Sequence, residues 1–175
     1  SAPYGSFGNG SAMRVAPIAW AFDSVDEVLR AAEQSAVVTH DHPEGVKGAQ
    51  ATALAVFLAR KGADKRDIAA EITDRFGYEL TRTPNEIRPT YKFDVTCQGS
   101  VPQSIVCFLA ADSFEDTVRT AISLGGDADT MAAIAGSIAE PYFGGVPAEI
   151  DREVRDRLHG DLLDVLERFE RPCRA

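Results

Sequence analysis

Apolar residues recur at intervals of three and four along most of the chain, and this spacing predicts amphipathic α-helices. The stretch that follows Ser24 is typical, with apolar positions at Val25, Val28, Leu29 and Ala32. Three other stretches are apolar on nearly every side and predict buried helices: residues 13–22, 46–59 and 131–139. Residues 91–95 instead predict a short extended segment. The fold class predicted by this pattern is all-α.

Small polar residues mark where several of these helices begin. Ser24 and Ser113 are each followed three residues later by an acidic side chain, which is the spacing of a capping box. Asp64 is predicted to start a further helix, and Gly77 to end it. Two more amphipathic helices are predicted near the end of the chain, over residues 147–158 and 161–169.

Two prolines lie inside apolar stretches that otherwise favour helix. Pro17 comes early enough in residues 13–22 to be tolerated near a first turn. Pro102 is predicted to occupy the first turn of a helix that carries Ile105 and Val106. Because the chain has no internal repeat, linker or low-complexity segment, residues 1–175 are predicted to form a single domain.

Composition narrows the classes of function. The chain has 175 residues, of which 45% are apolar and 26% charged, as in globular proteins. Its net charge of −9 argues against nucleic acid or an anionic membrane as a partner, because both require a basic face. No run has the length of a membrane span. Cys97, Cys107 and Cys173 lack CxxC spacing and predict reduced thiols in a cytoplasmic protein.

Two polar segments could contact a ligand. Residues 6–14 read Ser-Phe-Gly-Asn-Gly-Ser-Ala-Met-Arg, and glycines that free backbone N–H groups beside a helix start can hold a phosphate or diphosphate. An ordinary glycine-rich turn is the alternative. The second segment contains His40 and His42, a pair that could bind a transition metal. Its acidic surroundings make zinc a weaker hypothesis than a histidine that contacts a ligand, and a surface-loop histidine is the alternative.

A third polar segment, Gly-Gly-Asp-Ala-Asp-Thr at residues 125–130, opens the apolar stretch 131–139. Residues two apart on a regular helix point about 200° away from each other. Asp127 and Asp129 can therefore converge only if Asp127 lies on non-helical backbone, which Gly125 and Gly126 permit. Converging carboxylates with the Thr130 hydroxyl would suit a hard cation such as Mg²⁺. The alternative is a doubly acidic helix cap without a metal.

Together the three segments resemble the ADP-ribosylglycohydrolase family. The resemblance spans residues 3–170 and is carried in family order by Gly8-Asn-Gly-Ser-Ala-Met-Arg14, by Thr39-His40 with Pro43-Glu-Gly and Lys47-Gly-Ala, and by Gly125-Gly-Asp-Ala-Asp-Thr130. The family implies an all-α fold with a two-Mg²⁺ centre. It also implies hydrolysis of the N- or O-glycosidic bond at the C1″ carbon of an ADP-ribosyl group.

The resemblance also assigns roles to residues of this chain. Asp127 and Asp129 would be catalytic and, with Thr130, would bind metal. The residues that line the diphosphate and distal ribose would be Ser6, Phe7, Gly8, Asn9, Gly10, Ser11 and Met13. His40 would contact the ligand, and so would Gly125 and Gly126 in the turn before the metal ligands. The metals would hold the ribose hydroxyls and a water beside an oxocarbenium-like transition state.

One part of the family pattern does not match. Family members carry an N-terminal Thr-Asp-Asp cluster that completes the metal shell, whereas this chain has no adjacent Asp-Asp pair. The most similar segment, residues 115–117, lies in the first turn of a predicted ordinary helix. The resemblance therefore predicts a C-terminal portion of a longer fold. Such a portion would be completed by an N-terminal segment, or would self-associate through apolar surface left exposed on residues 13–22 and 46–59.

Two functional hypotheses follow from this partial match. The first is an ADP-ribosylglycohydrolase, for which we expect little hydrolysis by this chain alone because half the metal ligands are missing. The second is a binding module that holds ADP-ribose without hydrolysing it. For the enzyme, arginine-linked, serine-linked and nucleobase-linked ADP-ribose and O-acetyl-ADP-ribose all stay open as substrates.

Overall fold

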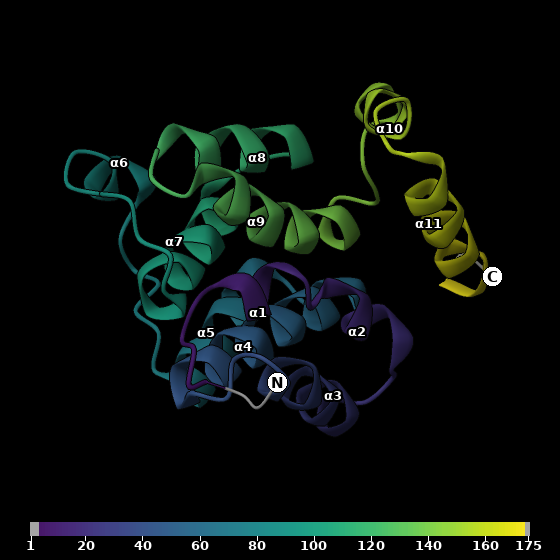
Figure 1. The fold of residues 1–175 in the computed structure, drawn as a ribbon. Coiled ribbons are helices and arrows are strands. Elements are labelled where there is room, and N and C mark those ends of the chain that lie inside the picture. The colour runs from purple at the N-terminus through teal and green to yellow at the C-terminus, as the bar shows by residue number, and fades with distance from the viewer. Residues whose placement is uncertain (1–3, 174–175) are drawn as a thin grey trace.

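The long helix α4 (Pro43–Arg60) is the element around which the fold is built (Figure 1). The structure, a computed structural model, describes residues 4–173, and every residue of α4 from 48 to 57 is buried except Gln50. The other helices are α1 (Gly10–Met13), α2 (Ala16–Ala21), α3 (Val25–Val37), α5 (Lys65–Phe76), α6 (Pro84–Ile87), α7 (Cys97–Ala110), α8 (Phe114–Ser123), α9 (Ala128–Tyr142), α10 (Ala148–Arg155) and α11 (Gly160–Cys173). The all-α prediction is confirmed.

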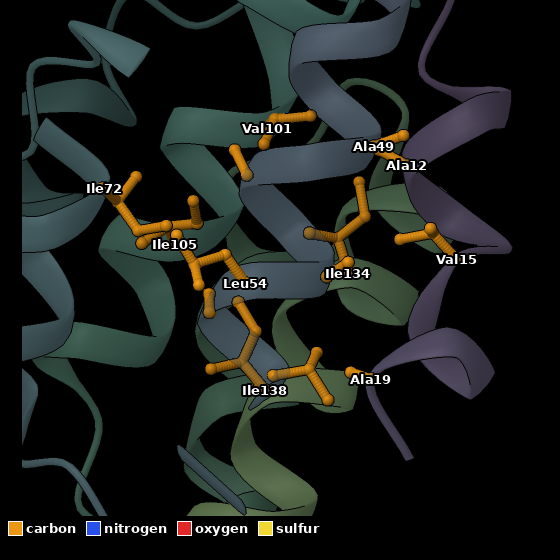
Figure 2. Packing of buried hydrophobic residues seen from close by; sticks show 14 of the residues in the cluster. Ala12, Val15, Ala19, Ala49, Leu54, Ile72, Val101, Ile105, Ile134 and Ile138 are labelled. Atoms are coloured by element: carbon orange, nitrogen blue, oxygen red, sulfur yellow. The ribbon is translucent and has the colours of Figure 1, made fainter. Parts of the chain in front are cut away.

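The alanine and glycine content of α4 lets its neighbours approach closely. Helices α1, α2, α3, α5, α7 and α9 all contact it. A Cβ atom added to Gly48 would overlap the Cys97 side chain at the start of α7, so that side chain packs directly on the α4 backbone. Figure 2 shows Leu54 of α4 among Ile105 of α7 and Ile134 and Ile138 of α9. These four side chains are fully buried, and each such burial stabilises the fold by about 1.5–3 kcal/mol.

Two of the three predicted buried helices are confirmed and one is wrong. Residues 46–59 and 131–139 lie in the buried helices α4 and α9. Residues 13–22 do not form one helix, because α1 ends at Met13 and α2 begins at Ala16. Pro17 explains the break, since its ring conflicts with the carbonyl four residues earlier and it has no N–H to donate. Met13 is 49% exposed, and the α4 surface that was expected to be exposed is covered.

Helix α7 begins earlier than predicted. Thr96 is its N-cap and accepts a hydrogen bond from Gly99 N at 3.0 Å, so that Pro102 lies inside the helix and not in its first turn. Residues 91–95 form no strand. The β pairing in residues 4–173 is a single bridge between Gly8 and Thr96. It is flanked by hydrogen bonds from Asn9 N to Val95 O (2.8 Å) and from Cys97 N to Phe7 O (2.9 Å).

The remaining elements follow the sequence pattern. Ser24, Asp64 and Ser113 each accept a hydrogen bond from the backbone N–H three residues on, as predicted for N-caps. Gly77 ends α5 in the left-handed conformation, with φ 65°. Helices α10 and α11 stand apart from the other helices in Figure 1. The Arg155–Glu170 ion pair joins these two helices at 2.6 Å.

Two of the three thiols are free and buried. Burial raises the pKa of Cys97 to about 11 and that of Cys107 to about 12, which keeps both protonated at neutral pH. The side chain of Cys173 lies outside the described part of the structure. A search of the described helices for one long and apolar enough to cross a membrane found none.

Candidate functional site

The acidic turn, residues 125–130, has the backbone that the sequence predicted. Gly125 and Gly126 are left-handed, with φ of 74° and 67°. Asp127 follows at φ −81° and ψ 60°, outside the helical region. It occupies the N-cap position of α9, yet its side chain makes no capping hydrogen bond. The Asp127 carboxylate is thus turned away from its own helix, which argues against a simple acidic cap.

The partner of that carboxylate is Asn9, 118 residues away in the sequence. Asn9 is 6% exposed, and its Nδ2 donates to Asp127 Oδ2 at 2.7 Å. The same amide donates to Ser100 Oγ at 3.1 Å, and that hydroxyl donates to Thr96 O at 2.5 Å. One buried amide therefore ties the N-terminal loop and the first turns of α7 and α9 together.

The rest of the acidic turn is less tightly connected. Thr130 is 8% exposed, and its hydroxyl points to Met13 Sδ at 3.7 Å. Asp129 is exposed in the first turn of α9. The turn thus faces α1 through Thr130 and the Asn9 loop through Asp127. Convergence of Asp129 with these two residues on one cation stays a prediction.

The glycine loop, residues 6–11, is held in place by hydrogen bonds on its buried side. Ser11 is fully buried and donates to Gly45 O of α4 at 2.7 Å. Cys97 Sγ donates to Gly8 O at 3.2 Å. Ser6 Oγ accepts from Gly8 N at 3.2 Å, and the 44% exposed Phe7 ring meets His42 edge to face. The loop is therefore pinned from within while part of it stays open to a ligand.

The two histidines of residues 39–42 have different tasks. His42 is the N-cap of α4, because its Nδ1 accepts from Glu44 N at 3.1 Å. His40 instead lies against the glycine loop. A Cβ atom built on Gly10 would be only 3.2 Å from His40 Nε2, and one on Gly8 would be 3.5 Å away. Burial, together with the Arg14 charge, lowers the pKa of His40. The structure thus places the His40 ring against Gly8 and Gly10, whereas His42 caps α4 and contacts the loop through the Phe7 ring.

The donor groups fit a hard cation in part. Two carboxylates and a hydroxyl at residues 127, 129 and 130 are oxygen ligands of the type that Mg²⁺ prefers. Across residues 4–173, no three His, Cys, Asp or Glu side chains form a group that could hold a metal ion. A cation held by these three side chains, with water or a further protein segment as the other ligands, stays a prediction.

Two residues at this site gave no signal in the sequence. Ser100 precedes Pro102, which was predicted to occupy the first turn of its helix, and Tyr91 belongs to the predicted extended segment 91–95. The Tyr91 hydroxyl donates to Gly99 O at 2.8 Å, and a Cβ atom on Gly126 would come within 2.7 Å of the Tyr91 ring. Burial, with the Asp94 and Asp127 charges, raises the pKa of Tyr91 to about 12. Tyr91 thus packs directly behind the acidic turn.

Comparison with known proteins shows the family of the chain. The family model for ADP-ribosylglycohydrolase matches residues 1–174. The chain belongs to the ADP-ribosylglycohydrolase family. It is 34% identical to the ADP-ribosylhydrolase ARH3 of Homo sapiens, in a match that covers 80% of this chain and 51% of that protein. It is 29% identical to the ADP-ribosylarginine hydrolase Tri1 of Pseudomonas putida (strain GB-1), over 81% of this chain and 40% of that protein.

A solved structure supports the fold. The chain matches a protein described as an ADP-ribosylglycohydrolase-related protein complex with a TM-score of 0.74 and 24% sequence identity. The match covers 96% of this chain and 60% of that one. The chain thus spans about half the length of the curated ADP-ribosylhydrolases that it matches.

Proposed function

We propose that this chain binds ADP-ribose, or an ADP-ribosyl group on an acceptor, between the glycine loop and the acidic turn. The observation that carries the proposal is the Asn9–Asp127 hydrogen bond of 2.7 Å. It joins the segment suited to a diphosphate to the segment suited to a cation, although the two are far apart in sequence. Family membership supplies the ligand class.

Each part of the site has a chemical role in this proposal. Backbone N–H groups of the glycine loop other than those of Gly8 and Asn9, which donate to Ser6 Oγ and Val95 O, would hold the diphosphate. His40 would donate to the same ligand. Asp127, Asp129 and Thr130 would hold Mg²⁺, which when bound would orient the ribose hydroxyls and a water. Asn9 would keep the Asp127 carboxylate aimed at the glycine loop, because its amide is buried and has two fixed partners.

In the full family architecture, we propose that this site contributes to hydrolysis of the glycosidic bond at C1″. The partial set of metal ligands in the described residues favours a second candidate for this chain by itself. In that case it would hold ADP-ribose with Mg²⁺ and leave the bond intact. The Pseudomonas relative is named for ADP-ribosylarginine, so arginine-linked ADP-ribose is the first substrate to test.

The test compares binding with turnover. The purified chain is incubated with Mg²⁺ and ADP-ribosylated substrates, beside the Asp127→Ala and Asp129→Ala variants. We expect binding by the unmodified chain with little or no hydrolysis. We also expect hydrolysis to appear when a segment bearing the family's Thr-Asp-Asp cluster is added in trans. Robust turnover by the chain alone, lost in both variants, would show that the partial metal site suffices.

We also propose that the chain self-associates. Apolar side chains are exposed on α10 and α11, with Leu162 at 57%, Val165 at 54% and Val154 at 49%. Exposed apolar side chains favour association where they form a contiguous patch. Light scattering should show a mass that rises with protein concentration, and a monomer over the whole range would contradict this proposal.

A further inference from the structure

Three side chains from two segments, Arg14 and the adjacent pair Thr39 and His40, form a chain of hydrogen bonds beside the glycine loop. Arg14, at the end of α1, donates from Nη2 to Thr39 Oγ1 at 2.7 Å. Thr39 Oγ1 in turn lies 2.7 Å from His40 Nδ1. On the far side of the imidazole, Nε2 faces Gly8 and Gly10. The hydrogen bonds thus connect the Arg14 guanidinium, through the Thr39 hydroxyl, to His40 Nδ1, while His40 Nε2 is the ring nitrogen that faces the glycine loop.

The donor and acceptor properties of these groups decide the direction of each bond. A guanidinium has no lone pair to offer, so Arg14 can only donate to the Thr39 hydroxyl. That bond occupies one lone pair of Oγ1 and leaves its hydrogen free to point at His40 Nδ1. Nδ1 then accepts, and the proton of a neutral imidazole must be on Nε2. If Nδ1 carried the proton, the Thr39 hydroxyl would accept twice and its own hydrogen would have no acceptor in this chain of bonds.

We propose that Thr39, itself held by Arg14, fixes the tautomer of His40 in which Nε2 carries the proton and presents it to the glycine loop. Thr39 and Arg14 are thus positioning residues, which act on the ligand through His40. The ligand is the diphosphate of the proposed function, and to that extent the inference rests on it. An N–H aimed at a phosphate oxygen attracts it, whereas an unprotonated Nε2 would repel it.

The surroundings of His40 favour the neutral ring. Burial and the Arg14 guanidinium both disfavour the imidazolium and lower the pKa of His40. The neighbouring carboxylate of Asp41 is engaged elsewhere, accepting from Gly5 N at 2.6 Å. Arg14 is itself fixed by a second bond, from Nη2 to Ser35 O at 2.9 Å near the C-terminal end of α3. A cation is favoured at that end of a helix, which helps to hold the guanidinium in place.

The experiment reads the tautomer directly. Histidine ¹⁵N spectra distinguish a protonated ring nitrogen from an unprotonated one, and the chain has only three histidines, His40, His42 and His159. Spectra are recorded at neutral pH on the free unmodified chain and on Thr39→Val, Thr39→Ser and Arg14→Met. Thr81→Val is the matched control, because it removes an exposed hydroxyl bonded to Glu79 and not to His40. ADP-ribose binding is measured on the same proteins by calorimetry.

We expect His40 in the unmodified chain, in Thr39→Ser and in Thr81→Val to carry its proton on Nε2. Thr39→Val should yield a mixture of tautomers and about tenfold weaker ADP-ribose binding, in line with the loss of one charge-assisted hydrogen bond. Arg14→Met should give a smaller change in the same direction. A proton on Nδ1 in the unmodified chain, or an unchanged tautomer in Thr39→Val, would overturn the inference. An Nε2 proton with no ADP-ribose binding would overturn the proposed function and leave the assignment of the tautomer standing.

Discussion

Helices α8 and α9 begin with similar residues and use them in opposite ways. At α8, Ser113 Oγ accepts from Asp116 N at 3.1 Å, and Asp116 Oδ2 accepts from Asp112 N at 3.0 Å. Thr117 donates back to Ser113 O at 2.8 Å. Every partner lies within four residues, so these side chains serve their own helix.

At α9 the corresponding acidic and hydroxyl side chains contact other segments of the chain. Asp127 makes no capping bond and accepts from Asn9 instead. Thr130 points to Met13, 117 residues away. Two left-handed glycines before Asp127 produce this difference, because they rotate its carboxylate off the helix axis. The side chains at the start of α8 thus serve their own helix, whereas those at the start of α9 contact other segments.

The largest effect is expected from an alanine in the turn before α9. Gly126→Ala should cost about 3 kcal/mol, because the left-handed backbone is strained and the new Cβ atom meets the Tyr91 ring. Gly125→Ala is the matched control and should cost about 1 kcal/mol, since it has the same strain and open space around it. Urea unfolding of both variants measures the difference. Equal losses would show that Tyr91 does not support the turn.

A smaller loss is expected when the link between the two segments is removed. Asn9→Ala leaves Asp127 without its amide donor in a part-buried site and should cost about 2 kcal/mol. Asn85→Ala also removes a side-chain hydrogen bond, to Arg88, but an exposed one, and should cost less than about 0.5 kcal/mol. Thermal and urea unfolding should agree on this ranking, and similar costs for the two variants would contradict the role given to Asn9.

The next prediction tests whether Asp127 acts as a helix cap, as Ser113 does. Ser113→Ala should cost about 1 kcal/mol of stability, the usual cost of losing an N-cap. Asp127→Asn should cost less than about 0.5 kcal/mol, because the carboxylate caps nothing and an amide oxygen in its place can still accept from Asn9 Nδ2. If unfolding experiments show that Asp127→Asn is as destabilising as Ser113→Ala, the acidic turn is a structural cap after all.

The smallest effect concerns pH at another locally capped helix, α6. Hydrogen bonds from Thr83 N and Oγ1 lower the pKa of Glu86. A carboxyl whose pKa is lower in the folded state stabilises the fold above its unfolded pKa, and this stability is lost as pH falls through the folded pKa. Between about pH 5 and about pH 3, Glu86→Gln should therefore lose stability less steeply than the unmodified chain. Parallel curves from thermal unfolding would contradict this.

Local patterns predicted the helices and their caps well. Ser24, Asp64, Ser113 and Gly77 act on residues within five positions, so spacing alone identified them. Two predictions about helices that contain proline were wrong. Pro17 broke a stretch that looked continuous, and Pro102 was outweighed by the Thr96 cap. In both places the chain had two local options, and the apolar pattern does not distinguish them.

The local backbone of the site could be predicted from the sequence, but the contacts between its segments could not. The backbone at Asp127 followed from the two glycines before it, because the requirement is local. The meeting of Asn9 with Asp127 did not follow from spacing, since it depends on how α1, α7 and α9 pack. The hydrogen bonds of the Ser100, Tyr91 and Thr39 hydroxyls could not be predicted either, because the residue type does not indicate which distant group a hydroxyl contacts.

The most direct test of the account is calorimetric titration of ADP-ribose into the unmodified chain, Asp127→Ala and Ser113→Ala, with and without Mg²⁺. The account predicts Mg²⁺-dependent binding by the unmodified chain and by Ser113→Ala, despite the lower stability of that variant. It predicts at least tenfold weaker binding by Asp127→Ala. Equal, Mg²⁺-independent affinities for all three proteins would contradict the claim that the start of α9 is a ligand site.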